Sequence, residues 1–329
     1  MDIEQPGELV DYLRSRGRIV GGETPEIRVL AGGVSNRTVL VQRTGGEAWV
    51  IKQALAKLRT QADWFSDPAR VHREALGLRW LEKLAPPGTI TPLIFEDHEH
   101  HLLAMEAVPE PHENWKTMLL DGRLEMRHVE QFAELLAAIH QGSTKVPELR
   151  KLFDDRSFFE SLRLEPYYAY AAEQVPAARC FLDNLIADTH RRRVALVHGD
   201  YSPKNILVRG DRLVLLDHEV IHWGDPSFDI GFALTHLLSK AHHRHDRRFL
   251  EAAARFVEVY RRKAELDEVL GARHTLGCML ARVAGRSPLE YLNDAQRQRQ
   301  REAVVDAMGS TPRLLRELIE SLGRRLLSI

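Results

Sequence analysis

Two short apolar runs in this chain each lead into acidic or amide side chains at fixed spacing. The first run ends at Val197 and leads to Asp200, and Asn205 follows five positions later. The second run, Leu213 to Leu216, ends in Asp217. A carboxylate can orient a hydroxyl and take its proton, and an amide oxygen beside a second carboxylate suits Mg²⁺, which prefers oxygen ligands. The spacing therefore predicts phosphoryl transfer, which depends mainly on positioned charge around a triphosphate.

The elements that must position these residues change in kind along the chain. Strand-like runs around turn residues dominate the first third, and helical patterns dominate the rest. We expect an opening helix, 2–16; strands at 27–30, 38–42, 49–52, 92–95, 101–105, 206–208 and 213–216; and helices that include 71–84, 128–140, 177–191 and the segments after 230. A connector with two prolines, 106–111, separates the two regions.

This order of elements predicts an α+β protein with two lobes and a cleft between them. The first lobe, residues 1–107, would be small, rich in strands and nucleotide-binding. The second, residues 108–329, would be larger and helical, and would carry the catalytic loop, the metal site and the acceptor pocket.

The composition restricts the class of protein. The chain has 329 residues, a formal net charge of −1, and two cysteines without zinc spacing. This charge provides no strong overall field for nucleic acid or an anionic membrane, and the cysteine usage fits a reducing compartment. The first residues, Met1 to Glu4, lack the basic-then-apolar pattern of a signal peptide, so we expect none. No apolar run approaches the roughly 18 residues that a membrane span requires. We expect a cytoplasmic protein with neither a nucleic-acid nor a membrane partner, and its oligomeric state is not predicted.

The chain resembles the aminoglycoside phosphotransferase and choline kinase-like family, related to the protein kinases, over roughly residues 30–238. The strongest match is His198-Gly199-Asp200 with Asn205, joined across the second predicted hairpin to Leu216-Asp217-His218-Glu219. The resemblance implies a bilobal protein-kinase-like fold and ATP or GTP as phosphate donor. It implies that Asp200 is the catalytic residue and that Asn205 and Asp217 bind Mg²⁺. His198 would brace the loop, and Glu219 would support the metal site.

The same resemblance assigns a phosphate-binding lysine to the first lobe. Lys52 looks like the strand lysine that contacts the donor phosphates, and Glu74 looks like its helix partner. A buried ammonium beside phosphates needs an anion to hold its position. Glu82 lies on the same expected helix and is the alternative partner.

A glycine-rich turn and the lobe connector complete the expected nucleotide site. Gly32, Gly33 and Ser35 look like the family's phosphate loop, where glycines let the backbone approach the nucleotide closely. Glu106 and Val108 lie in the expected hinge, where backbone groups can reach the adenine. A simple hairpin turn is the competing interpretation for the glycines.

The acceptor is expected to be a hydroxyl of a small molecule, but the sequence leaves its identity open. Residues 51–55 and 58–59 look like the corresponding part of methylthioribose kinases, whereas the loop Tyr201–Asn205 keeps the general phosphotransferase pattern. An aminoglycoside, a methylthioribose-like sugar, choline, an amino alcohol and another sugar all remain candidates.

Two alternative functions are less favoured by the sequence. A kinase-shaped module could sense nucleotide without catalysis, although retention of Lys52, Asp200, Asn205 and Asp217 argues against this. A protein kinase is disfavoured because no Ala-Pro-Glu signature follows Asp217.

Other chemically capable residues are given structural interpretations. We expect solvated loops for two histidine groups, core packing for a tyrosine cluster, a helix end for an arginine run, and a cap or loop brace for Asp229. The residues are His98, His100, His101, His242, His243 and His245; Tyr167, Tyr168 and Tyr170; and Arg191 to Arg193. Substrate contact by Trp223 or Asp225 is the less favoured interpretation for those two residues.

Overall fold

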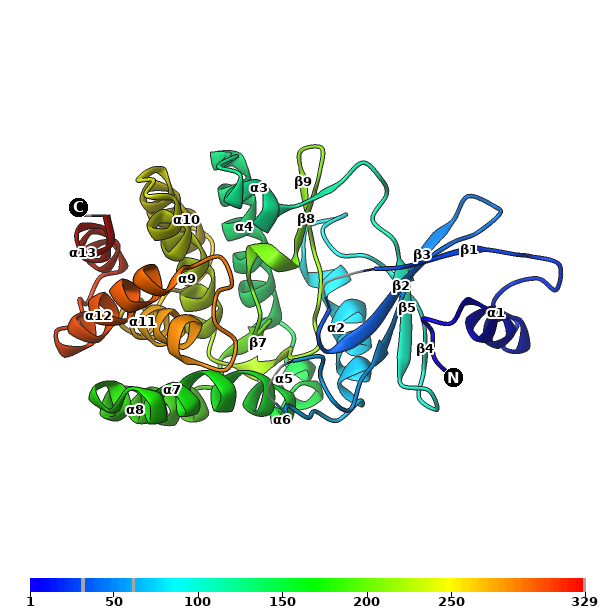
Figure 1. Cartoon of the computed structure of the whole chain (residues 1–329), viewed down its shortest axis with the longest axis horizontal. Helices are drawn as coiled ribbons and strands as arrows, with labels where there is room; N and C mark the ends of the chain where they lie inside the picture. Colours follow the sequence, from blue (N-terminus) through cyan, green and yellow to red (C-terminus); the bar gives the residue numbers. More distant parts are fainter. Residues whose placement is uncertain (31–32, 61–62, 328–329) are drawn as a thin grey trace.

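The computed structural model of the chain describes residues 1–30, 33–60 and 63–327. Strands gather at one end of its long axis and helices at the other (Figure 1). This arrangement confirms the predicted α+β, bilobal fold. The division after residue 107 stays a prediction. No helix among the described residues is long and apolar enough to span a membrane.

The first lobe is built on a five-stranded antiparallel sheet in the order β1-β2-β3-β5-β4. Its strands are β1 (Glu26–Val29), β2 (Asn36–Gln42), β3 (Ala48–Ala54), β4 (Leu93–Asp97) and β5 (Leu102–Glu106), and its helices are α1 (Pro6–Ser15) and α2 (Arg70–Leu84). Successive side chains of a strand point to opposite faces of the sheet. Accordingly, Leu102 and Ala104 pack in the cluster that includes α1, and Leu103 and Met105 pack in the cluster that includes α2.

The helical lobe carries two small sheets beside its helices. The strands β6 (Glu113–Asn114), β8 (Ile206–Arg209) and β9 (Arg212–Leu215) form one sheet, and β7 (Ala195–Val197) pairs with β10 (His222–Gly224). The sequence predicted β8 and β9 but not β6 or β10, which are only two or three residues long. The β8–β9 hairpin is the one that carries Asn205 and Asp217 at its open end.

The remaining elements of this lobe are helices of very different length. They are α3 (Trp115–Leu120), α4 (Met126–Ser143), α5 (Glu148–Leu152), α6 (Ser157–Phe159), the π-helix η1 (Glu160–Ala169), α7 (Tyr170–Gln174), η2 (Pro176–Ala178), α8 (Arg179–Arg191), η3 (Pro203–Asn205), α9 (Ser227–Arg244), α10 (Arg248–Arg261), α11 (Glu268–Ala284), α12 (Asp294–Gly309) and α13 (Leu315–Leu327). The π-helix contains Pro166, which cannot donate a backbone hydrogen bond, and was not predicted.

Helix α9 lies at the centre of the helical lobe. It is buried along its whole length from Ser227 to His242, and Figure 1 shows α10 and α11 beside it. Burial on all sides places this helix in the core of the lobe, although it carries polar residues such as Asp229 and Lys240. Gly231 permits the closest approach, because a Cβ built there would lie 2.5 Å from the carbonyl carbon of His274 on α11.

Replacing Gly231 by Ala should destabilise the protein by about 1–3 kcal/mol or more, because α9 and α11 would have to separate. Chemical denaturation would measure the free energy of unfolding. Gly309→Ala on α12 is the matched control, since a Cβ there would meet no atom within 4 Å. Equal stability of the Gly231→Ala variant and the wild type would contradict the close packing of α9 on α11.

Candidate active site

The β8–β9 hairpin brings two predicted metal ligands together. Ile206 pairs with Leu215, so Asn205 and Leu216 lie opposite each other at the open end of the hairpin, where the Leu216 N–H donates to the Asn205 carbonyl at 2.9 Å. Asp217 follows directly and has a positive φ of 67°. The side chains of Asn205 and Asp217 both line the same cleft.

That cleft has a volume of about 1020 Å³ and lies between the first-lobe sheet and the β8–β9 hairpin. Its lining includes most of the residues predicted to bind nucleotide or metal. These are Gly33, Ser35, Lys52, Glu106, Val108, Asn205 and Asp217. Glu74 and Asp200 lie behind this lining, each in contact with a residue that forms it. The predicted Gly32 lies outside the described residues.

Lys52 links three elements at the base of the cleft. Its ammonium on β3 lies 2.7 Å from Glu74 Oε1 on α2 and 3.1 Å from Asp217 Oδ1. Glu74 is fully buried, whereas the alternative partner Glu82 is exposed. Burial alone would lower the pKa of Lys52, but Asp217 and Glu74 outweigh it and raise that pKa. The ammonium therefore stays charged.

The two carboxylates that share this ammonium differ in electrostatic environment. Burial raises the pKa of Glu74, and nearby Asp217 adds to the rise. Burial would also raise the pKa of Asp217. The positive charges of Lys52 and Lys204 outweigh burial, so the pKa of Asp217 is lowered. Asp217 is thus the carboxylate that remains ionised and faces the cleft.

Asp200 is 3% exposed and is surrounded by hydrogen-bond donors. Its Oδ2 lies 2.8 Å from Asn205 Nδ2, 2.9 Å from Arg163 Nη2 and 3.2 Å from Lys204 Nζ. Burial would raise the pKa of Asp200, but Arg163 and Lys204 outweigh it and lower that pKa. The side chain is therefore ionised and pre-oriented.

Arg163 and Lys204 are site residues that the sequence analysis missed. Lys204 lies inside the motif, four positions after Asp200, and that spacing was the available signal. Arg163 comes from the unpredicted π-helix and also donates to the Gly199 carbonyl at 3.0 Å, so no motif marked it.

The loop that contains Asp200 is braced from helix α9. Asp229 accepts hydrogen bonds from the backbone N–H groups of His198 at 2.7 Å and Gly199 at 2.8 Å, and lies 3.1 Å from His140 Nε2. Gly199 has a φ of +78°, which favours glycine. Of the two roles expected for Asp229, the loop brace is confirmed.

His198 also braces the loop, as expected. Its Nδ1 accepts from the Asp200 N–H at 3.2 Å, and its Nε2 lies 3.1 Å from His218 Nδ1. His218 is fully buried, and its backbone N–H donates to Glu74 at 3.4 Å. A hydrogen-bonded path thus joins the Asp200 loop to α2.

Glu219 does not line the cleft, although it was expected to support the metal site. Its Oε2 lies 3.1 Å from Arg70 Nε and 3.3 Å from Asn36 Nδ2. Arg70 is fully buried at the start of α2 and also donates to the Leu55 carbonyl at 2.9 Å. This group holds α2, the segment after β3 and the loop after Asp217 together, which is a structural role.

Some structural interpretations hold and others fail. Tyr167 and Tyr168 are buried, as expected. Asp225 is buried against Arg192 and His274, so substrate contact is not supported. The solvated-loop prediction is wrong for His242, which is buried on α9 and lies 3.0 Å from the Gln296 carbonyl and 3.2 Å from that of Leu326.

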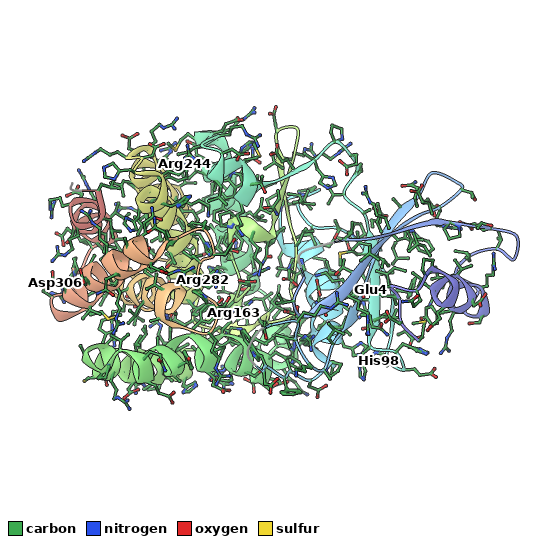
Figure 2. The ribbon with its side chains drawn as sticks, viewed as in Figure 1. Glu4, His98, Arg163, Arg244, Arg282 and Asp306 are labelled. Atoms are coloured by element: carbon green, nitrogen blue, oxygen red, sulfur yellow. The ribbon has the colours of Figure 1, made fainter. Side chains whose placement is uncertain are left out.

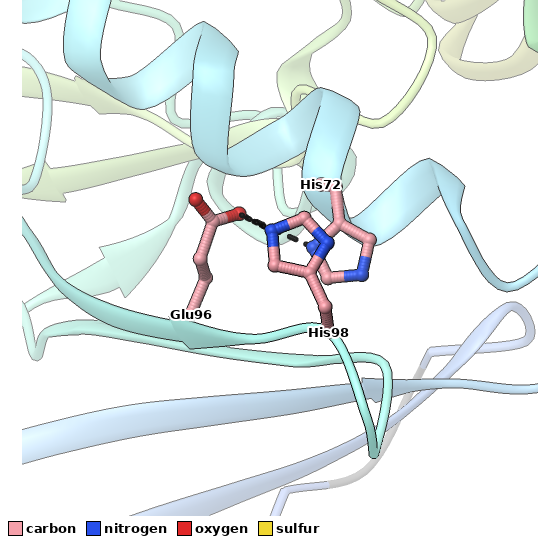
Figure 3. A group of neighbouring side chains, drawn as sticks. All are labelled: His72, Glu96 and His98. Carbon is pink, nitrogen blue, oxygen red and sulfur yellow. Dashed lines mark hydrogen bonds and ion pairs between the residues drawn. The ribbon is translucent and has the colours of Figure 1, made fainter.

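The other histidine group lies at the edge of the first-lobe sheet (Figure 3). His98, in the turn after β4, stacks on His72 of α2 with ring centroids 3.8 Å apart, and both face Glu96. His72 Nδ1 lies 3.2 Å and Arg79 Nη2 lies 2.7 Å from the Glu96 carboxylate. Because the side chain of His98 is 74% exposed, its expected solvation is confirmed.

The fold and the cleft define a bilobal protein of the kinase-like class. The model of the phosphotransferase enzyme family, APH, matches residues 26–266 of the chain. The chain therefore belongs to this family, which confirms the resemblance noted in the sequence.

Individual relatives are more distant. A methylthioribose kinase from Pectobacterium atrosepticum is 26% identical over 267 residues, which cover 70% of this chain and 64% of the relative. The chain thus spans less than two thirds of that relative's length.

Solved structures share the fold at low sequence identity. The amicoumacin kinase hAmiN, in complex with AMP-PNP, Ca²⁺ and Ami, aligns with a TM-score of 0.57 at 13% identity and covers 94% of this chain and 96% of its own. A choline/ethanolamine kinase family protein from Mesorhizobium loti aligns with a TM-score of 0.51 at 16% identity, covering 96% and 99%.

Acidification should destabilise the region around the Asp200 loop. His222 is 2% exposed on β10 and stacks on Phe159, and burial lowers its pKa to about 4. The unfolded chain takes up this proton near pH 6.5. The free energy of unfolding should therefore fall as the pH is lowered from about 6.5 to 4, by up to about 3 kcal/mol from this residue.

Denaturant titrations between pH 7 and pH 4 would measure this dependence. His222→Met should show a shallower fall than the wild type, and His98→Gln, at the exposed turn, is the matched control. An unchanged pH dependence in His222→Met would contradict the assignment.

Proposed function

We propose that this protein is an ATP-dependent small-molecule kinase, which transfers the γ-phosphoryl group to a hydroxyl. One observation carries the proposal: Lys52, Asn205 and Asp217 line one cleft, and Asp200 is hydrogen-bonded to Asn205 directly behind it. Membership of the phosphotransferase family supports the same reaction class.

The cleft supports a specific orientation of the nucleotide. Leu40, Val50 and Met105 give it apolar walls, and the segment Glu106–Val108 presents backbone groups beside them. We place the adenine here and the phosphates near Lys52, with Gly33 and Ser35 beside them. Glu74 then serves to hold the Lys52 ammonium in place.

The donor set fits Mg²⁺. The Nδ2 group of Asn205 donates to Asp200 at 2.8 Å, which leaves its amide oxygen free to bind a cation, and Asp217 is held ionised. Both are hard oxygen ligands of the kind that Mg²⁺ prefers. A magnesium ion held by them would neutralise charge on the phosphates.

Asp200 would orient the acceptor hydroxyl and receive its proton. Its lowered pKa makes it a weak base in the resting state. Orientation is therefore its main contribution before the transition state, and proton transfer follows as the new O–P bond forms. Arg163 and Lys204 keep the carboxylate in place for this task.

The similarity to methylthioribose kinases supports a sugar-like acceptor, one of the candidates that the sequence left open. A cytoplasmic location stays a prediction. The acceptor would enter from the side of the helical lobe, next to Asp200.

Asp200→Asn should reduce phosphoryl transfer at least about 100-fold, because the amide can neither take the proton nor carry the charge. Its affinity for MgATP should stay within about threefold of wild type. Transfer would be measured as ADP release across a panel of hydroxylated metabolites, and binding by calorimetry. Asp183→Asn, exposed on α8, is the control.

Turnover of Asp200→Asn near the wild-type level would refute the assigned role. MgATP binding by the wild type without transfer to any acceptor would instead favour a nucleotide sensor.

Asp217→Asn should weaken nucleotide binding about tenfold or more in the presence of Mg²⁺ but barely change it in EDTA, because the lost carboxylate acts through the metal. Calorimetric titrations with ATP under both conditions test this. Asp211→Asn, exposed in the turn at the other end of the same hairpin, is the matched control. Equal losses with and without Mg²⁺ would show that Asp217 is not a metal ligand.

A further inference from the structure

A line of cationic and aromatic side chains leads from Asp200 into the helical lobe. Tyr167 of the π-helix contacts both Arg163 and Arg282, and each guanidinium carbon is 5.7 Å from the ring centroid. Arg282 Nη1 also donates to the Tyr167 hydroxyl at 3.1 Å. Figure 2 shows Arg163 and Arg282 near each other in this lobe. Since Arg163 pairs with Asp200, this cluster begins at the proposed reacting carboxylate.

Helix α9 continues the line with residues spaced four apart, which share one helix face. The rings of Phe232 and Tyr167 stack at 6.0 Å, and His236 meets Phe232 edge-on at 5.1 Å. One turn further, the Lys240 ammonium donates to the His236 carbonyl at 3.4 Å and lies 5.3 Å from the Tyr291 ring centroid.

Several polar groups of this cluster are buried without a partner. Among the described residues, His236 Nε2, Arg282 Nε and the Tyr291 hydroxyl have no hydrogen-bond partner, and no carboxylate lies within ion-pair distance of Lys240. His236 is 5% and Lys240 0% exposed. Buried polar groups and buried charges are costly unless they are paired. A ligand that accepts hydrogen bonds would supply partners for the donors among these groups.

The charge of the cluster indicates the sign of that ligand. The strongest charges acting on His236 are those of Lys240, Arg282, Lys204 and Lys116, all cationic. Burial and the charges of Lys116 and Arg282 lower the pKa of Lys240 to about 7. The carboxylate of Glu290 opposes this effect but does not outweigh it. Lys116 and Glu290 pair at the exposed rim. An anion fits this site and a cation does not.

Resting on the proposed kinase function, we propose that the acceptor carries an oxyanion, a carboxylate or a phosphate, which binds to Lys240, Arg282 and Lys116 while its hydroxyl faces Asp200. The oxyanion would supply hydrogen-bond acceptors to the unpaired donors. The aromatic face of Tyr167, on which a cationic acceptor such as choline or an aminoglycoside could otherwise stack, is already occupied by two arginines.

A matched ligand panel tests the proposal. Glycerol, ribose and glucose skeletons would each be offered as the neutral polyol, the amine, the carboxylate and the phosphate ester. Binding is measured by calorimetry on the Asp200→Asn variant with Mg²⁺ and AMP-PNP, and transfer is measured on the wild type with MgATP. On at least one skeleton, an anionic member should bind about tenfold or more tightly than its neutral and amine counterparts. Comparison of the carboxylate with the phosphate ester of each skeleton shows which of the two anionic groups the site prefers.

Variants at the site provide the second readout. Lys240→Met should weaken binding of the preferred anion about tenfold or more and leave the affinity for AMP-PNP unchanged. Lys116→Gln at the rim serves the same purpose if Lys240→Met does not fold. Lys263→Met, a half-exposed lysine paired with Glu134, is the matched control and should change neither affinity.

Tighter binding of the neutral or amine members, no binding of any anionic member at 10 mM, or unchanged anion affinity in the site variants would each overturn the proposal. The kinase function is judged separately, by MgATP binding and phosphoryl transfer of the wild type. Anion binding is therefore also measured without nucleotide, where a failure of the kinase function cannot affect it.

Discussion

The ion pair between Lys52 and Asp217 is the interaction on which the rest of the site depends. It joins the middle strand of the first-lobe sheet to the end of the β8–β9 hairpin, and Glu74 holds it from α2. A largely buried ammonium is stable only with such partners. Because the three groups come from separate elements, their geometry fixes how the sheet, α2 and the hairpin meet. The relative placement of the sheet, α2 and the hairpin in turn determines the shape of the cleft.

The charges on the two sides of Asp200 are arranged differently. On the side of the cleft, Asp217 and Glu74 both pair with Lys52. Under the proposed function, this arrangement would admit a metal ion together with the donor phosphates. On the helical side, the charges that act most strongly on His236 are those of Lys240, Arg282, Lys204 and Lys116, all cationic. The overall net charge of −1 conceals this polarity. The positions of the charged side chains therefore indicate more about the ligands than the net charge does.

The sequence predicted the elements whose pattern is local and strong. The strands of the first lobe, helix α2 and the β8–β9 hairpin lie within a few residues of their expected positions, and hairpin register alone brings Asn205 close to Asp217. The sequence did not reveal Arg163, because a π-helix with an internal proline has no simple periodicity. It also missed the burial of Lys240 and His242, which depends on how α10 to α13 pack around α9.

Different turns of helix α9 make contacts of two different kinds. Its first turn holds the backbone of the Asp200 loop through Asp229, and its later turns present Phe232, His236 and Lys240. Under the functions proposed above, exchange of these three side chains would change which acceptors bind without shifting the Asp200 loop. Evolution or protein engineering could therefore diversify acceptor specificity by substitutions one helical turn apart on α9, while the Asp200 loop keeps its position.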